Sequence, residues 1–249
     1  MTVTALSLEA EILGALDTVT DPELDQPITE LGFVRSVAVD DEGVTVHLRL
    51  PTAFCSPNFA YLMASDTLDA LRALDGIGEV RVLLDDHHDS DKINAGLAAD
   101  AGYVGTFGSE AHHSLDELRK TFQRKAHTAA MERAVTALLN QGVARANEIG
   151  RLILRDLPDG PAKSALLRRR FAVGLNVCPN SRVVVDDEGR PLPDEAVPMR
   201  LRFARSVRIS MEGNAHFCRG LLATRYSDGA DVNRDPVPQF TNTRTRSPR

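Results

Sequence analysis

The chain of 249 residues is poor in the residues that mark several protein classes. It contains no tryptophan, only 5% of its residues are aromatic, and it has three cysteines. A small and odd number of cysteines argues against a disulfide framework and leaves reduced thiols or metal ligands. The scarcity of aromatic side chains leaves little with which to stack on nucleic-acid bases. We therefore expect neither a disulfide-stabilised scaffold nor a nucleic-acid-binding protein.

Long apolar runs and sorting signals are also missing. No stretch approaches the roughly 20 apolar residues that a membrane-spanning helix needs. The first residues, Met1 to Thr4, contain no Lys or Arg, unlike a secretory signal or a transit peptide. We expect a cytoplasmic protein without a membrane partner. At roughly 150 residues per domain, the length allows one large domain or two ordinary ones.

The charge of the chain is unevenly distributed. The formal net charge is −6, but residues 1–100 contain 19 acidic and 5 basic residues, whereas the remaining 149 contain 16 acidic and 24 basic ones. The acidic part would repel phosphate, which disfavours nucleic-acid binding further. The basic part is suited either to docking onto a partner or to folding against the acidic part.

The first 85 residues show a regular order of elements. Apolar residues first recur at helical spacing after an expected N-cap at Ser7. They then alternate with polar residues in two strands joined by an acidic turn. A second helical pattern and a third alternating stretch follow. This order predicts an α+β domain at residues 5–97, with two helices on one face of a small mixed sheet. The predicted elements are a helix over 7–19, strands over 33–39 and 44–50, a helix over 57–74 and a strand over 80–84.

The rest of the chain has a less regular pattern. Three glycines within seven residues indicate a Gly-rich linker over 98–113. We expect a C-terminal domain of unassigned fold at 114–226, mainly helical at first, with one long helix over 115–140. Strands are expected in its last third, at 183–185 and 199–209, and a flexible tail at 227–249.

Cys55 lies at the position best suited to chemistry. It leaves a buried strand and directly precedes a helix start at Ser56-Pro57, where the helix dipole and free N–H groups stabilise a thiolate. Such a thiol binds soft metals or attacks electrophiles. The alternative is that Cys55 serves only as a small apolar residue packed under the helix. Asp21 and Glu23, in the turn after the first helix, are either an acidic pair at the same end of the sheet or an ordinary Asp-Pro-Glu turn.

Further metal ligands are sparse. His216 and Cys218, two residues apart on an expected strand, would share a face, and Cys178 would bring the ligands to three of the four that a tetrahedral site takes. Cys55 could join this site. The spacing is not that of a zinc finger, so buried structural cysteines are the alternative. His87 and His88, among aspartates, suit a divalent metal site in a loop or a solvated acidic loop.

Four segments carry a resemblance to a known family. Asp21 to Leu24, Pro27 to Val34, Leu50 to Pro57 and Leu74 to Val80 resemble, in this order, the iron-sulfur assembly domain found in PaaD and SufT. The resemblance covers about residues 5–85. It includes a Thr-x-x-Cys-x-Pro motif that begins at Thr52, although many relatives have Cys-Pro directly. A fainter likeness, in Asp85 to Leu97 and in overall length, is to accessory proteins of soluble diiron monooxygenases.

The resemblance implies a domain that helps to mature iron-sulfur or other iron proteins, with Cys55 as the functional thiol and Asp21 and Glu23 as the acidic pair. The first hypothesis is therefore a maturation factor that carries iron or an iron-sulfur cluster transiently, while its C-terminal region recognises a client apo-metalloenzyme such as an iron-dependent oxygenase. The second is an accessory chaperone that binds no metal and stabilises a diiron monooxygenase subunit. We do not expect an enzyme, because no histidine is committed as a base for Cys55; a homodimer is left open.

Overall fold

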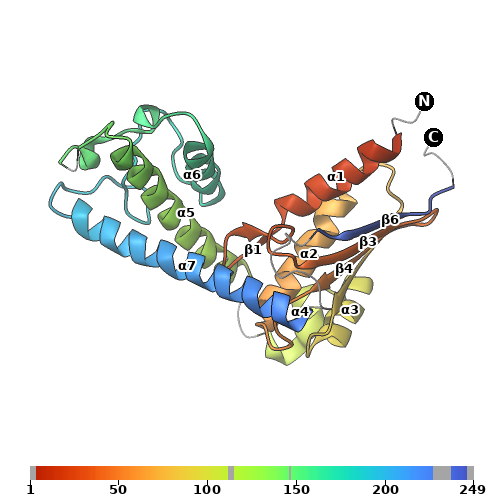
Figure 1. The fold of residues 1–249 in the computed structure, drawn as a ribbon. Helices are drawn as coiled ribbons and strands as arrows, with labels where there is room; N and C mark the ends of the chain where they lie inside the picture. Colours follow the sequence, from red (N-terminus) through yellow and green to blue (C-terminus); the bar gives the residue numbers. More distant parts are fainter. Residues whose placement is uncertain (1–3, 112–114, 146, 227–236, 246–249) are drawn as a thin grey trace. The chain divides into compact units, whose positions relative to one another are not determined.

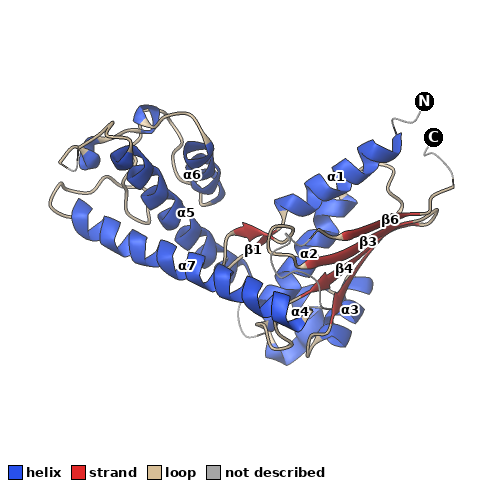
Figure 2. Cartoon of the chain, viewed as in Figure 1, coloured by secondary structure: helices blue, strands red, loops and turns tan. Residues whose placement is uncertain are grey.

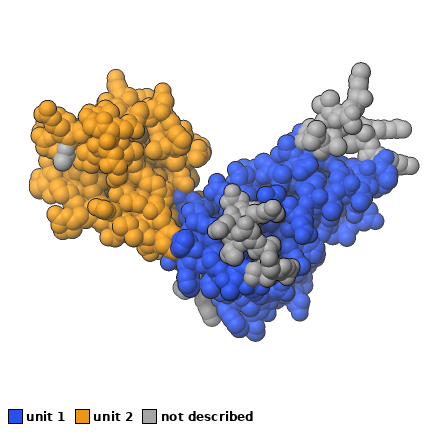
Figure 3. Space-filling view, viewed as in Figure 1, with its two compact units in different colours: residues 1–115, 214–249 blue, residues 116–213 orange. Residues whose placement is uncertain are grey.

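The chain folds into two compact units, each with its own hydrophobic core (Figure 3). The computed structural model describes residues 4–111, 115–145, 147–226 and 237–245. Unit 1 comprises Met1–Leu115 and Asn214–Arg249, and unit 2 comprises Asp116–Gly213. Residues 214–226, expected in the C-terminal domain, thus belong to unit 1. Unit 1 is the acidic unit, with 23 acidic and 11 basic residues, whereas unit 2 has 12 acidic and 18 basic ones.

Unit 1 shows the predicted order of elements (Figure 1). The α+β class is confirmed. The first helix begins at Thr4, so Ser7 lies inside it and is not its N-cap. Two short strands also pair across the Asp-Pro-Glu turn. The elements are α1 Thr4–Thr18, β1 Thr20–Asp21, β2 Gln26–Pro27, β3 Val34–Val39, β4 Gly43–Arg49, α2 Pro57–Arg72 and β5 Glu79–Asp85.

The main sheet has the strand order β5-β4-β3-β6 (Figure 2). Strands β3 and β4 form the predicted antiparallel hairpin, and β4 pairs in parallel with β5 through the crossover helix α2. Helix α1 packs on α2, which packs on β5. In the register of these two strands, Arg49 at the end of β4 lies opposite Asp85 at the end of β5. Because both strands end at the same edge, the loops that follow them lie next to each other.

The segment expected to be a linker is part of unit 1. Helix α3 spans Ser90–Ala98, α4 spans Gly102–Phe107, and a 3-10 turn, η1, spans Gly108–Glu110. The Phe107 ring is buried and lies 6.0 Å from the Tyr61 ring, centroid to centroid. The glycines suggested a loop, but the aromatic residue between them is buried in the core. Residues 112 and 113 of the expected linker lie outside the described residues.

Part of the expected flexible tail is also ordered. Gln239–Asn242 form β6, which pairs in parallel with β3 at the edge of the sheet. The Arg244 guanidinium then donates hydrogen bonds to the backbone oxygens of Asp40 and Ile77. Residues 227–236 and 246–249 of this segment lie outside the described residues.

Unit 2 is mainly helical. Helix α5, Leu115–Asn140, confirms the predicted long helix; its first residue belongs to unit 1. The core of unit 2 contains Met131, Leu166 and Val183, and the buried Glu132 carboxylate forms an ion pair with Arg208. The remaining elements are the 3-10 turns η2 Ile149–Arg151 and η3 Leu154–Asp156 and the helices α6 Pro161–Ala172 and α7 Val197–Arg225.

The predicted strand at 199–209 is wrong, because these residues belong to α7. The buried residues Val197, Ala204 and Met211 repeat every seven residues, as on one face of a helix. Val183–Val185 are buried but make only an isolated bridge between Val185 and Pro191, not a regular strand. In the last third of the chain, the described β-structure therefore consists of strand β6 and two isolated bridges, Val185 with Pro191 and Arg182 with Ile153.

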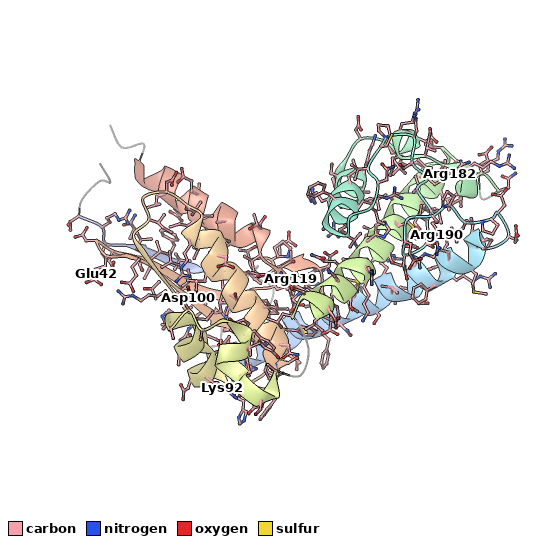
Figure 4. All side chains as sticks on the ribbon, turned by 180° about the vertical axis from the view of Figure 1, so that it is seen from behind. Glu42, Lys92, Asp100, Arg119, Arg182 and Arg190 are labelled. Carbon is pink, nitrogen blue, oxygen red and sulfur yellow. The ribbon has the colours of Figure 1, made fainter. Side chains whose placement is uncertain are left out.

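Charged side chains lie over the outside of both units (Figure 4). In unit 1, Glu42 pairs with Arg81 at 2.8 Å and Lys92 pairs with Glu110 at 2.7 Å. Such exposed pairs contribute little to stability, because water and salt screen their charges. None of the helices in the described ranges combines the length and the apolar character needed to cross a bilayer.

Candidate functional site

The candidate site lies where β4 and β5 end. The loop after β4, residues 50–56, contains Thr52 and Cys55, and the loop after β5 contains His87 and His88. The parallel register of the two strands brings these loops together. The sequence motifs that were singled out separately are therefore neighbours in space.

Cys55 is half-buried and packs against the core of unit 1. Its Sγ lies 3.5 Å from the hydroxyl oxygen of Thr52, the first residue of the Thr-x-x-Cys-x-Pro motif. Ser56 is the N-cap residue of α2, and Pro57 is the first residue of the helix. Proline fits this position because its missing N–H would be unpaired there in any case. The thiol therefore lies at a helix N-terminus, as the sequence predicts.

His87 holds the Cys55 loop in place. Its ring is buried; Nε2 donates a hydrogen bond to the backbone oxygen of Cys55 at 2.8 Å, and Nδ1 accepts one from the Asp89 N–H at 3.1 Å. Both ring nitrogens are thus occupied by protein partners. The backbone N–H of His88 donates to the Ala53 oxygen at 2.9 Å, which ties the same two loops together. This geometry assigns His87 a positioning role, and a metal-binding role for the two histidines stays a prediction.

Asp21 is the buried acid of the site, with a side chain that is almost wholly covered. The backbone N–H groups of Glu23 and Leu24 donate to its Oδ1 at 2.8 and 2.9 Å. Burial raises the pKa of the Asp21 carboxyl to about 6, although these two hydrogen bonds act in the opposite direction. Glu23 is half-buried. The Asp-Pro-Glu segment is therefore a tight turn, and the charge of Glu23 also raises the pKa of the Asp21 carboxyl.

The last turns of α7 pack against this acidic turn. Asn214 donates to a carboxylate oxygen of Glu23 at 3.5 Å, and Arg219 donates to the side-chain oxygen of Gln26 at 2.6 Å. Leu222 of the same helix is buried in the core of unit 1. These contacts join residues about 190 positions apart in the sequence.

The end of α7 is bound to the loops that carry Cys55 and His87. Arg225 donates to the backbone oxygen of Leu50 at 3.1 Å and to that of Asp86 at 2.5 Å. The next residue, Tyr226, stacks its ring under the guanidinium of Arg49, 5.0 Å from the ring centroid. The sequence interpretation missed these residues because it expected a strand at 199–209 and no helix in this part of the chain; helical spacing along 197–226 was the signal that could have revealed α7.

Cys218 lies on α7 between these contacts. It is half-buried and packs against the same core as Cys55. Burial raises the pKa of the Cys218 thiol to about 11; Asp21, Cys55 and Glu23 raise it further and Arg219 lowers it. The structure thus brings two cysteines and two carboxyl groups from three distant segments into one electrostatic neighbourhood.

The other expected ligands lie elsewhere. His216 is exposed, and on a helix two residues apart point about 200° away from each other, so the expectation of a face shared with Cys218 is wrong. Cys178 is exposed in unit 2. Among the residues that the structure describes, no group of three or more His, Cys, Asp or Glu side chains is arranged to hold a metal ion. A metal site that includes Cys178 and His216 stays a prediction.

Comparison with known proteins agrees with this picture of unit 1. The family model for iron-sulfur cluster assembly proteins matches residues 9–84. Uncharacterized protein MJ1129 of Methanocaldococcus jannaschii is 35% identical over 85 residues, which cover 34% of this chain and 87% of that protein. The Fe-S protein maturation auxiliary factor YitW of Bacillus subtilis is 32% identical over 76 residues, 30% of this chain and 74% of that protein.

No solved structure matches the chain. The family match contains the acidic turn, the Thr-x-x-Cys-x-Pro motif and the strand that follows α2, in the order from which the resemblance was inferred. It ends before α3, so α7 and all of unit 2 lie outside it. Through residues 9–84, the chain belongs to the family of iron-sulfur cluster assembly proteins.

Proposed function

We propose that this protein is a cytoplasmic maturation factor that passes iron or an iron-sulfur cluster to a client apo-metalloenzyme, with Cys55 as the thiol that holds the cargo. The observation that carries the proposal is the placement of Cys55: a half-buried thiol at a helix N-terminus, inside the segment that matches the family. Soft thiolate ligands select iron-sulfur clusters over hard cations such as magnesium.

The surroundings of Cys55 suit a carrier better than a permanent metal site. A carrier has to bind its cargo and then release it, so it needs few ligands and open coordination positions. The thiol is only half-buried, and no described group of three or more ligands surrounds it. The acidic turn of Asp21 and Glu23 belongs to the same unit and is bound to α7, so carboxylates on this side of the unit favour a cationic cargo. The cargo is a substrate that passes through the site.

We propose that unit 2 recognises the client. It carries an excess of basic residues and exposes large apolar side chains, among them Phe171, 80% exposed, and Phe203, 55% exposed. Exposed apolar residues within a basic surface suit an acidic protein partner. The fainter resemblance to accessory proteins of diiron monooxygenases suggests an iron-dependent oxygenase as the client.

The experiment that tests the carrier role is anaerobic reconstitution of the full chain with ferrous iron and sulfide. We expect wild type to bind iron and Cys55→Ser to bind far less. Cys178→Ser, which removes the exposed thiol of unit 2, tests the alternative site at Cys178 and His216; if Cys55 holds the cargo, this variant binds as wild type does. Equal iron in wild type and Cys55→Ser would contradict the carrier role of this thiol.

Co-expression with an apo-oxygenase separates the carrier from the accessory chaperone. A carrier raises the iron content of the client, and Cys55→Ser abolishes this increase. A chaperone that binds no metal raises the soluble yield of the client equally well with and without Cys55. The second result would replace the proposed function.

A further inference from the structure

We propose that Cys218, supplied by the C-terminal helix α7, is the second thiol of the cargo site and that it holds a soft metal ion together with Cys55. This inference rests on the proposed function, because it names a further ligand for the same cargo. Cys218 lies outside the segment that matches the family, so the family match does not supply this ligand.

The periodicity of α7 directs Cys218 toward the interior of unit 1. Ala215 and Leu222 are buried in its core, at 0% and 4% exposure. Cys218 follows Ala215 by three residues and precedes Leu222 by four, which places all three on one face of the helix. Its neighbours Phe217 and His216 are exposed on other faces.

Hydrogen bonds on both sides of Cys218 hold this face against the candidate site. Toward the start of the helix, Asn214 contacts Glu23 of the acidic turn. Toward its end, Arg225 binds the backbone oxygen of Leu50, the residue at which the Cys55 loop begins. Cys218 lies between these two anchors, and both thiols pack against the core of unit 1. The contacts that hold Cys218 on the side of the Cys55 loop do not themselves involve a metal.

The chemistry of this neighbourhood selects a soft or borderline cation. Through Asn214 and Arg219, α7 contacts the turn that contains the carboxyl groups of Asp21 and Glu23, so this neighbourhood favours a cation. Thiolates bind ferrous iron, cobalt and zinc in tetrahedral geometry. Two cysteines leave two of the four positions open for sulfide or for ligands of the client. Such a site can receive and release its cargo without unfolding.

The test is an anaerobic titration of the reduced full chain with Co²⁺, followed by the thiolate-to-cobalt charge-transfer absorption. For Cys218→Ser and for Cys55→Ser we expect about half of the wild-type absorption at saturation and roughly tenfold weaker binding or more. Cys178→Ser removes the thiol of the alternative site in unit 2 and should titrate as wild type does if Cys55 and Cys218 hold the ion. Circular dichroism of each variant verifies that the helix content of the chain is unchanged.

The outcomes separate this inference from the proposed function. If Cys55→Ser loses binding and Cys218→Ser titrates as wild type does, the carrier role stands and the second thiol is refuted. If neither variant differs from wild type, both proposals fail. If Cys218→Ser loses binding as Cys55→Ser does, both are supported.

A measurement on the wild-type chain does not depend on the folding of a variant. Dibromobimane becomes strongly fluorescent when two neighbouring thiols displace both of its bromides. We expect it to link Cys55 to Cys218, as shown by peptide mapping, and excess Co²⁺ to protect both thiols. Labelling without a Cys55–Cys218 link would overturn the inference.

Discussion

Replacing Asp21 by asparagine should stabilise unit 1 at neutral and alkaline pH. Asparagine keeps the oxygen that accepts the N–H groups of Glu23 and Leu24, but it cannot ionise in the buried position that Asp21 occupies. The folded-state pKa of about 6 lies above the ordinary value of 3.8. Between these values the folded state binds more protons than the unfolded state, so the free energy of unfolding falls as pH rises.

The size of this effect follows from the pKa difference. One pKa unit corresponds to about 1.4 kcal/mol, so ionising the buried carboxyl costs about 3 kcal/mol of unfolding free energy. The protein bears this whole cost above pH 6, where the folded state is ionised, and none of it below pH 4. Asp21→Asn should therefore exceed wild type in unfolding free energy by about 2–3 kcal/mol at pH 8 and match it at pH 4. The metal-free protein is used, so that bound metal does not contribute.

Intrinsic fluorescence suits this measurement because the chain has no tryptophan and its three tyrosines, Tyr61, Tyr103 and Tyr226, all lie in unit 1. Urea titrations followed by tyrosine emission report on that unit. Asp40→Asn is the matched control: this exposed carboxylate accepts the same pair of backbone hydrogen bonds, which lower its pKa, so its replacement should not stabilise the protein at pH 8. No gain for Asp21→Asn at pH 8, or an equal gain at pH 4, would refute the reasoning.

Three further substitutions test the packing of α7 and of the site. Leu222→Ala should lower the unfolding free energy of unit 1 by about 2–4 kcal/mol, measured by tyrosine emission in urea; a loss below 1 kcal/mol would mean that this end of α7 is not packed. His87→Ala removes the hydrogen bond to the Cys55 oxygen, and amide hydrogen exchange in the loop should become faster; unchanged exchange would exclude its positioning role. Arg208→Ala leaves the buried Glu132 carboxylate with its hydrogen bond from Thr136 but without its ion-pair partner, and should destabilise unit 2 by about 3 kcal/mol, read from the exchange of α5 amides. Arg208→Lys should lose less, and equal losses would contradict an ionic cause.

Local periodicity was sufficient to predict most of the helices and strands in residues 1–85 and helix α5, because each of these elements buries apolar residues at the regular spacing of a helix or a strand. The same rule misled at 199–209. There the exposed Met199 and Phe203 alternate with the half-buried Leu201 and imitate a strand, while the small residue Ala204 is the one that is fully buried. Nothing in the local sequence distinguishes an exposed apolar residue from a core residue.

Local patterns were enough to predict the elements of the assembly domain and the placement of Cys55 between a strand and a helix N-terminus, because helical and strand periods, proline and N-cap preferences act over a few residues. Which segments contact one another is visible only in the folded chain. Strand β6 is a polar segment that forms against the edge of β3, and α7 packs Cys218, 163 positions after Cys55, against the core that Cys55 also contacts. Such contacts depend on burial and hydrogen bonds between distant segments, which no local pattern encodes.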